Sequence, residues 1–186
     1  NMDFLETIEV QDKFFTQYIG KYELNSILQN LSTQINNKYK DIVNKNDPLI
    51  IIGILNGSFM FLTDLVKLLD IHCEIEFIKV SSYIGTETSG KITDIIGLNK
   101  DITNKNILIV EDIVDTGLTM INIIEKFKSL NPKNIEICTL LHKVEKTINK
   151  MDLHYVGKVI KDKFVVGYGL DYNGQGRNLD CIYSII

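Results

Sequence analysis

Residues 107–120 read ILIVEDIVDTGLTM, and this stretch decides the fold. Its first four residues form a continuous apolar run, which is typical of a strand buried on both faces of a parallel sheet. Two carboxylates and a small polar turn follow, and residues 120–130 then carry apolar side chains at helical spacing. The order of buried strand, acidic end, polar turn and helix predicts one unit of an α/β sheet.

The polar turn at residues 115–119 predicts a phosphate-binding site. Open α/β sheets bind ligands at the carboxyl ends of their strands, and the N–H groups that open a helix favour an anion. Thr116 and Thr119 add hydroxyl donors, and Gly117 allows a ligand to approach the backbone closely. We therefore expect the turn to cradle a phosphate.

Two acids directly before the turn restrict the class of ligand that the site predicts. Glu111 and Asp112 cannot bind phosphate themselves, but carboxylates accept hydrogen bonds from sugar hydroxyls and attract metal ions. An isolated Asp-Thr-Gly would more often be only a helix start, with Asp115 as its N-cap. The combination of acids, glycine and threonines behind a buried strand favours a sugar phosphate.

Composition restricts the class of protein. The 186 residues predict a single domain, and 45% of them are hydrophobic, without a run long enough to span a membrane. The net charge of −4 argues against non-specific nucleic-acid binding. The start of the chain lacks the pattern of a signal peptide, and Cys73, Cys138 and Cys181 resemble buried thiols. We expect a cytoplasmic protein without a disulfide framework.

The rest of the chain repeats the alternation of strands and helices. Helical spacing predicts helices at residues 23–43 and 59–69, and apolar runs predict strands at 49–55 and 135–141. Residues 74–80 alternate polar and apolar side chains, which predicts a half-buried strand. This alternation predicts a doubly wound parallel α/β sheet with right-handed crossovers.

Two regions depart from that alternation. Residues 81–97 lack a sustained apolar period and predict a long loop, for which a lid and a mere connector are both open readings. The glycine-rich C-terminal part carries short strand-like pieces without a helix between them. We expect residues 1–19 and 151–186 to form a small hood over a core of residues 20–150.

Several segments resemble known signatures. Residues 107–119 resemble the phosphoribosyl diphosphate (PRPP) signature of the type I phosphoribosyltransferases, an apolar strand that runs into two acids and Asp-Thr-Gly/Ser-x-Thr. Residues 163–177 resemble the C-terminal signature of the hypoxanthine-guanine phosphoribosyltransferases, Lys-Phe-Val-Val-Gly-Tyr-Ala/Gly-Leu-Asp-Tyr with a later arginine. Residues 55–58, 80–83 and 140–143 resemble that family's diphosphate loop, the start of its lid and its purine-reading strand.

The resemblance implies the type I phosphoribosyltransferase fold and a salvage reaction. In it, the 5-phosphoribosyl group of PRPP passes reversibly to N9 of hypoxanthine or guanine, giving IMP or GMP and diphosphate. It also implies Mg²⁺ as cofactor, an oxocarbenium-like transition state, a closing lid, and assembly as a homodimer or homotetramer. The family often has a cis peptide bond at the position of Leu55-Asn56.

The resemblance also implies a role for individual residues. Asp115 would act at N7 of the purine as a general acid or base, and the lid would use Ser82 and Tyr83. The residues implied in ribose and PRPP binding are Glu111, Asp112, Asp115, Thr116, Gly117, Leu118 and Thr119. Those implied in diphosphate binding are Leu55, Asn56, Gly57 and Arg177. Those implied in purine binding are Lys143, Phe164, Val165 and Asp171. Those implied in metal binding are Asp171, Glu111 and Asp112.

Some features leave alternatives open. Many relatives carry Lys or Arg where Asn56 stands, so a side-chain charge on the diphosphate is missing here. A PRPP-sensing regulator of the same fold is one alternative, although it would usually add a nucleic-acid-binding module. An orotate or adenine phosphoribosyltransferase would lack Lys143 and the pattern at 164–171. A dehydrogenase is disfavoured because no G-x-G-x-x-G follows a strand.

Overall fold

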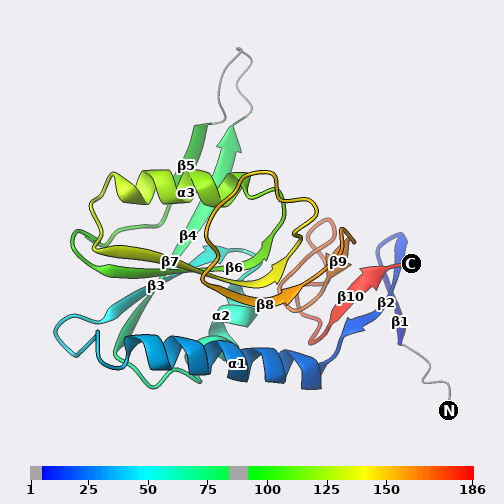
Figure 1. Cartoon of the computed structure of the whole chain (residues 1–186). Helices are drawn as coiled ribbons and strands as arrows, with labels where there is room; N and C mark the ends of the chain where they lie inside the picture. The colour runs from blue at the N-terminus through cyan, green and yellow to red at the C-terminus, as the bar shows by residue number, and fades with distance from the viewer. Residues whose placement is uncertain (1–5, 84–91) are drawn as a thin grey trace.

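The computed structural model describes residues 6–83 and 92–186, and it describes side chains outside residues 81–94. The described residues form a six-stranded main sheet and a four-stranded second sheet (Figure 1). The strand order of the main sheet is β5-β4-β3-β6-β7-β8. Its strands are β3 (Leu49–Leu55), β4 (Cys73–Tyr83), β5 (Ile92–Ile96), β6 (Asn106–Val114), β7 (Asn134–His142) and β8 (Tyr155–Val159). Only β5 runs antiparallel to its neighbour.

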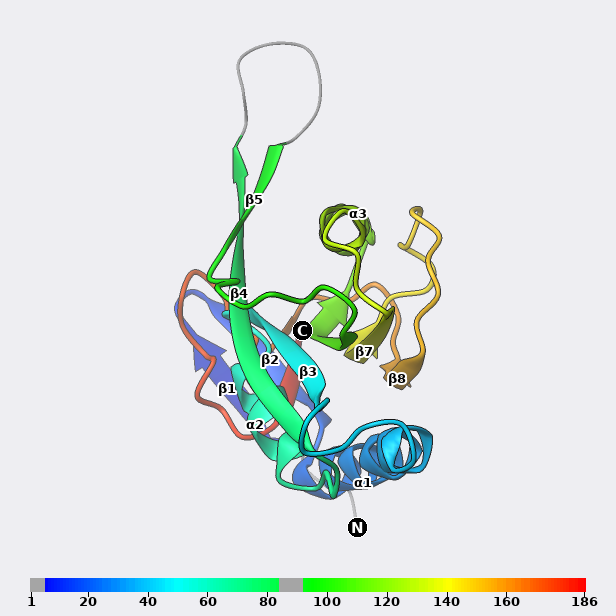
Figure 2. The same cartoon turned by 90° about the vertical axis from the view of Figure 1, so that its left-hand side faces the viewer.

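Helices cover both faces of the main sheet, which confirms the predicted doubly wound α/β fold. Figure 2 shows α3 (Leu118–Lys128) on one face and α1 (Lys21–Tyr39) with α2 (Phe59–Val66) on the other. In β3, Leu49 and Ile51 join the core under α1 and α2, whereas the alternate residues join the core under α3. Because both faces are covered, the strand is apolar throughout, as its sequence predicts.

The predicted helices exist, with shifted ends. The first begins two residues earlier than predicted, at Lys21, and ends at Tyr39, whose carbonyl accepts hydrogen bonds from Ile42 and Val43 in a turn. Its buried residues lie three or four positions apart, the spacing that places them on one face. The second helix ends at Val66, short of residue 69, because Leu68 and Leu69 bond three residues back in tighter turns.

Strand β6 is longer than the apolar run predicts. It continues to Val114, so Glu111 and Asp112 lie within the strand and not beyond its end. Glu111 pairs with Thr139 and Val114 with His142 of β7. The pairing with β7 holds the acids in extended backbone, a tertiary contact that the local pattern does not contain.

The predicted long loop at residues 81–97 is wrong in its described parts. Strand β4 continues to Tyr83, and β5 returns antiparallel from Ile92, with Tyr83 opposite Ile92 and Lys79 opposite Ile96. The middle of the expected lid, residues 84–91, lies outside the described residues.

The second sheet is the predicted hood, with one correction. Its strands are β1 (Thr7–Val10), β2 (Lys13–Ile19), β9 (Val165–Val166) and β10 (Ile182–Ile185), which join the two ends of the chain around a small core of their own. The predicted boundary at residue 151 is wrong, because β8 pairs in parallel with β7 and belongs to the main sheet.

Two features can be compared with the expectations from composition: the burial of the three cysteines and the character of the helices. Cys138 and Cys181 are buried, Cys73 is half-buried, and all three are free. Among the described residues, no helix combines the length and apolar character that a membrane span requires.

Candidate active site

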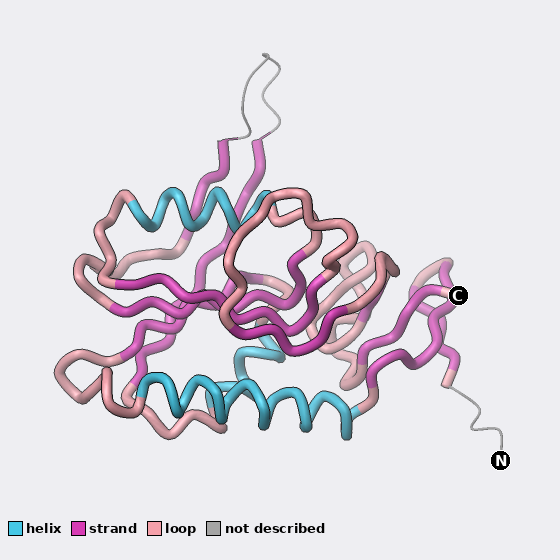
Figure 3. Tube along the Cα trace, viewed as in Figure 1, coloured by secondary structure: helices cyan, strands magenta, loops and turns pink. Residues whose placement is uncertain are grey.

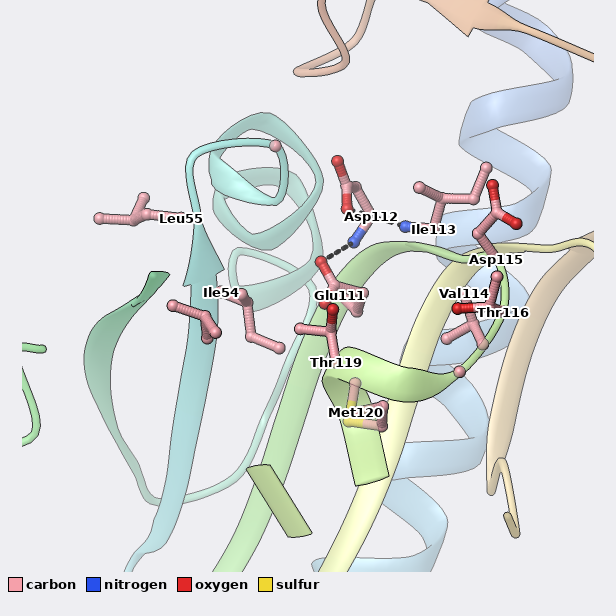
Figure 4. Close-up of a pocket in the computed structure, with 13 residues that line it drawn as sticks. Ile54, Leu55, Glu111, Asp112, Ile113, Val114, Asp115, Thr116, Thr119 and Met120 are labelled. Atoms are coloured by element: carbon pink, nitrogen blue, oxygen red, sulfur yellow. Dashed lines mark hydrogen bonds between the residues drawn. The ribbon is translucent and has the colours of Figure 1, made fainter. Parts of the chain in front are cut away.

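A pocket of about 280 Å³ lies at the carboxyl ends of β3 and β6, beside the start of α3 (Figure 4). It therefore occupies the place where open α/β sheets bind ligands. The residues that line it are Ile54, Leu55, Gly57, Val80, Glu111, Asp112, Ile113, Val114, Asp115, Thr116, Gly117, Thr119 and Met120.

The turn between β6 and α3 opens the helix toward the pocket. Gly117 is the N-cap of α3 and has φ +83°, a conformation that side chains disfavour. A Cβ at Gly117 would also meet the carbonyl oxygen of Asn149 at 2.9 Å. The first N–H groups of a helix lack partners within it and therefore favour an anion. In this turn the amide of Leu118 makes, among the described residues, only a long contact, at 3.4 Å, with Thr116 Oγ1.

Glu111 and Asp112 are buried next to one another. Each is only 9% exposed, and among the ion pairs of residues 6–80 and 95–186 neither acid is paired with a cation. Burial, and then the neighbouring charge of Asp112, raises the pKa of Glu111 well above its ordinary value. The amide of Asp112 donates to Glu111 Oε1 at 3.3 Å, and the amide of Ile113 donates to Asp112 Oδ1 at 2.8 Å. This leaves most of the acceptor capacity of the two acids unused.

The loop after β3 is pressed against the acidic pair. The peptide bond Leu55-Asn56 is cis, as the family resemblance suggests. A Cβ at Gly57 would overlap Asp112 Oδ2, and a Cβ at Gly169 would overlap the carbonyl oxygen of Gly57. Gly57 thus leaves room for the side chain of Asp112, and Gly169 lets the hood approach the backbone of the β3 loop.

Asp115 has cationic partners, unlike the acids before it. Its Oδ2 lies 3.4 Å from Lys143 Nζ and 3.0 Å from Lys146 Nζ. Both ammonium groups also contact Asp162 Oδ1, at 3.0 Å from Lys143 and 3.6 Å from Lys146. The other oxygen of Asp115, Oδ1, is buried without a hydrogen-bond partner. An unpaired buried acceptor is costly and is satisfied by a ligand that donates to it.

The loop between β7 and β8, a wide arch in Figure 3, is hydrogen-bonded to the backbone of the turn. Thr147 Oγ1 lies 2.6 Å from the carbonyl oxygen of Asp115, and Asn149 Nδ2 donates to the carbonyl of Thr116 at 3.0 Å. The amide of Lys143 donates to Val114 at 3.0 Å. These bonds fix the backbone of the turn without using its N–H groups.

The hood contributes a second set of predicted residues. Arg177 pairs with Asp171 at 2.8 Å, and its Nη1 donates to the carbonyl of Gly169 at 2.8 Å. Phe164 is 45% exposed and packs edge-on against Tyr172, with 5.8 Å between the ring centroids. Phe164 also lies 6.2 Å from Phe15 between ring centroids, so it is partly packed into the hood and partly exposed.

Comparisons with known proteins agree with this geometry. A family model described as a phosphoribosyl transferase domain matches residues 23–173. A curated hypoxanthine-guanine phosphoribosyltransferase of Staphylococcus epidermidis is 42% identical over 168 residues, 90% of this chain and 91% of that protein. The chain belongs to the hypoxanthine-guanine phosphoribosyltransferase family. The family predicted from the sequence is therefore confirmed.

Solved structures of the family have the same fold. The crystal structure of a hypoxanthine phosphoribosyltransferase from Staphylococcus aureus superposes with a TM-score of 0.82 and 40% identity, covering 91% of this chain and 90% of that one. A hypoxanthine phosphoribosyl transferase from Trypanosoma cruzi gives a TM-score of 0.85 at 30% identity, covering 96% and 95%.

The structure brings together part of the site predicted for this phosphoribosyltransferase. Eight of the predicted residues line the pocket: Leu55, Gly57, Glu111, Asp112, Asp115, Thr116, Gly117 and Thr119. Lys143 joins them through Asp115. The predicted residues with described side chains that do not line this pocket are Lys143 itself, Asn56, Leu118, Phe164, Val165, Asp171 and Arg177. The side chains of Ser82 and Tyr83 lie outside the described ones.

Sequence reasoning did not find the partners of Asp115 and Lys143. Lys146 lies three residues after Lys143, and Asp162 directly precedes the C-terminal signature. Both look like ordinary surface charges in the sequence, and only the approach of the β7–β8 loop to the turn makes them part of the site.

Proposed function

We propose that this member of the hypoxanthine-guanine phosphoribosyltransferase family transfers the 5-phosphoribosyl group of PRPP to N9 of hypoxanthine or guanine. The products are IMP or GMP and diphosphate. One observation carries the proposal: a phosphate-binding turn, two unpaired buried acids and a lysine–aspartate contact meet at a single pocket.

The PRPP side of the pocket matches a ribose 5-phosphate. The amides of the turn and the hydroxyls of Thr116 and Thr119 bind the phosphate. Glu111 and Asp112 accept hydrogen bonds from the ribose hydroxyls, which supply the donors that these buried acids lack within the protein. The backbone at Leu55 and Gly57 faces the diphosphate.

The purine side uses the residues beyond Asp115. Asp115 receives or holds the proton at N7, for which its unpartnered Oδ1 is suited. Lys143 donates to O6 of the base, which favours oxopurines because the amino group of adenine is itself a donor. Phe164 offers its exposed ring surface for stacking, and the backbone of Val165 reads the edge of the base.

Magnesium fits the acidic side of the site. Carboxylates and phosphate oxygens are the ligands that Mg²⁺ prefers, and Glu111 and Asp112 lack cationic partners among the described side chains. Among these residues no three acidic, histidine or cysteine side chains gather into a metal cluster, so PRPP would supply the remaining oxygens. Asp171 would join by exchanging its bond with Arg177. When bound, the ion neutralises charge on the leaving diphosphate.

The reaction needs a closed site. Breaking the bond between C1 and diphosphate develops positive charge on the ribose, which water would trap. We assign the lid to the antiparallel β4–β5 pair, in which Ser82 and Tyr83 lie at the end of β4 opposite Thr93 and Ile92. Arg177 would hold diphosphate oxygens with its planar guanidinium.

Self-association is part of the proposal. Among the described side chains, several large apolar ones on α2, β4 and β5 are exposed to solvent, namely Phe59, Ile75, Phe77 and Ile96. Burial of exposed apolar side chains favours assembly. We propose a cytoplasmic homodimer or homotetramer, and sedimentation of the purified protein tests the assembly.

A spectrophotometric assay tests the reaction. It would supply PRPP, Mg²⁺ and either hypoxanthine, guanine, xanthine or adenine to the wild-type protein and to Asp115→Asn. We expect turnover of oxopurines, lost without Mg²⁺ and strongly reduced in the variant. PRPP binding without turnover of any base would contradict the proposal and favour a PRPP sensor.

A further inference from the structure

Four charged side chains form a cluster beside the pocket: Asp115, Lys143, Lys146 and Asp162. This charge cluster contains two close contacts, Lys146 with Asp115 and Lys143 with Asp162, each at 3.0 Å. The other two contacts are longer, at 3.4 Å between Lys143 and Asp115 and 3.6 Å between Lys146 and Asp162. Each lysine therefore has its own carboxylate and a weaker contact with the other one.

The exposures of the four side chains differ. The side chain of Lys143 is only 7% exposed, whereas the other three are partly open to solvent. The hydrogen bond to Asp115 is the main cause that raises the pKa of Lys146, and the hydrogen bond from Lys143 is the main cause that lowers the pKa of Asp162. Both directions agree with the assignment of one carboxylate to each lysine.

The β7–β8 loop fixes Lys146 near Asp115. The amides of Lys146 and Thr147 both donate to the carbonyl of Lys143 at 3.1 Å, so the chain turns directly after Lys143. Thr147 Oγ1 bonds the carbonyl of Asp115 at 2.6 Å. The approach of Lys146 to Asp115 is thus built into the backbone and does not depend on a flexible side chain alone.

We propose that Lys146 is the positioning residue for Asp115 and that Asp162 is the positioning residue for Lys143. This inference rests on the proposed roles of Asp115 at N7 and Lys143 at O6. To contact O6, the ammonium of Lys143 must leave Asp115. Lys146 then remains as the cation that holds the Asp115 carboxylate, and Asp162 keeps Lys143 from returning to it.

Without Lys146, the two groups that are proposed to contact the purine, Asp115 and Lys143, would pair with one another. Lys143 would be the only ammonium of the cluster left for Asp115, and opposite charges at this distance attract. Lys143 would shift toward Asp115, and each group would be less available to the base. The groups assigned to PRPP are the acids Glu111 and Asp112 and the amides and hydroxyls of the turn, none of which pairs with Lys146 among the described side chains, so PRPP binding should change less than base binding.

Initial-rate kinetics with both substrates varied test this division. The variants are Lys146→Met, which keeps the length without the charge, and Lys146→Arg, which restores the charge. Lys150→Met is the matched control, because Lys150 lies on the same loop and has no ion pair among the described side chains. Calorimetric titration with GMP provides a second readout that does not need turnover.

We expect Lys146→Met to raise KM for guanine and hypoxanthine and Kd for GMP by about fivefold, the size of a partly exposed ion pair. KM for PRPP should stay within about twofold of the wild-type value, which corresponds to a change in binding free energy of roughly 0.4 kcal/mol. Lys146→Arg should restore the base KM to near the wild-type value, and Lys150→Met should match wild type. A merely structural role would raise both KM values together.

A double-mutant cycle with Lys143→Met sharpens the test. If Lys146 acts by freeing Lys143, its removal should cost less in the Lys143→Met background than in wild type. Asp162→Asn should also raise KM for the base more than KM for PRPP. An unchanged base KM in Lys146→Met, or a parallel rise in both KM values without rescue by arginine, would overturn the inference. A wild-type protein that turns over no base would instead overturn the proposed function, and this inference with it.

Discussion

The acids on the two sides of the pocket differ in their partners. Glu111 and Asp112 are buried together, and no cation pairs with either of them among the described side chains. Asp115, three residues later, has ammonium groups at 3.0 and 3.4 Å. The same short segment thus carries two acids without a cationic partner and one acid with two cationic partners.

The difference indicates where the substrate supplies the missing groups. Buried acids without a cation destabilise the empty protein, and ribose hydroxyls or a metal ion relieve that cost on binding. A paired acid keeps its charge and its position whether or not a ligand is bound. We infer that the unpaired acids bind PRPP and that the paired acid acts on the base. The predictions below test that contrast from the largest expected effect to the smallest.

Replacement of the paired acid should have the largest effect. Asp115→Asn keeps the shape of the side chain but cannot carry the negative charge or take up the proton. We expect kcat/KM for guanine to fall roughly 100- to 10,000-fold, the usual contribution of a general acid or base. Steady-state assays at fixed PRPP measure it, and an unchanged melting temperature would exclude misfolding. A loss below threefold would assign the proton transfer elsewhere.

Removal of the buried lysine should follow. Lys143→Met should lower kcat/KM for guanine roughly 10- to 100-fold, because a hydrogen bond from a charged donor contributes about 1.5–3 kcal/mol. Lys105→Met is the matched control. Lys105 lies outside the pocket and pairs with Asp47 at 2.9 Å, so its replacement should leave the kinetics unchanged. Equal losses in the two variants would contradict a specific role for Lys143.

PRPP binding by the unpaired acids should weaken when a methyl group is introduced next to Asp112. Gly57→Ala places a methyl group against Asp112 Oδ2, and displacing the acid should raise KM for PRPP about tenfold while affecting the base KM less. In Gly20→Ala the new methyl meets only the far end of the Gln17 side chain, so PRPP kinetics should not change. If Gly57→Ala left KM for PRPP unchanged, as expected for Gly20→Ala, the contact between Gly57 and Asp112 would not contribute to PRPP binding.

The smallest effect concerns stability. Because the pKa of Glu111 is raised in the folded protein, its contribution is fully present below its ordinary pKa near 4.5 and is lost as the pH rises. Glu111→Gln should therefore melt roughly 2–4 °C higher than wild type at pH 8, with the difference shrinking toward pH 4. Thermal unfolding without ligand, followed by circular dichroism, measures it.

Glu136 provides the opposite case as a control. Burial opposes its ionisation, but hydrogen bonds from Tyr155 and Tyr39, each at 2.7 Å, outweigh burial and lower its pKa. Its stabilising contribution is present above its ordinary pKa and is lost as the pH falls. Glu136→Gln should therefore melt lower than wild type at pH 8. A lower melting temperature for Glu111→Gln as well would contradict the contrast between the two acids.

The sequence predicts the parts of the fold that depend on local patterns. The continuous apolar runs of β3 and the first half of β6 identify buried parallel strands, and the buried spacing in α3 follows from its sequence. The hood sheet is different, because β2 pairs with β10 across most of the chain, with Phe15 opposite Ile185. Such non-local pairing carries little signal in short segments.

The site divides in the same way. The turn and its acids form one contiguous stretch, so their chemistry can be read from residues 111–119. Lys146 and Asp162 belong to other segments and are charged, so they resemble solvated surface residues until folding brings them to Asp115 and Lys143. The end of β6 could not be predicted either, because pairing with β7 extends it beyond the apolar run.

One measurement tests the central contrast most directly: initial-rate kinetics of Glu111→Gln and Lys146→Met, with PRPP and guanine both varied. We expect Glu111→Gln to raise KM for PRPP and leave KM for guanine near wild type, and Lys146→Met to do the reverse. If both variants changed the KM of the same substrate, the division of the pocket into an unpaired PRPP side and a paired purine side would be wrong.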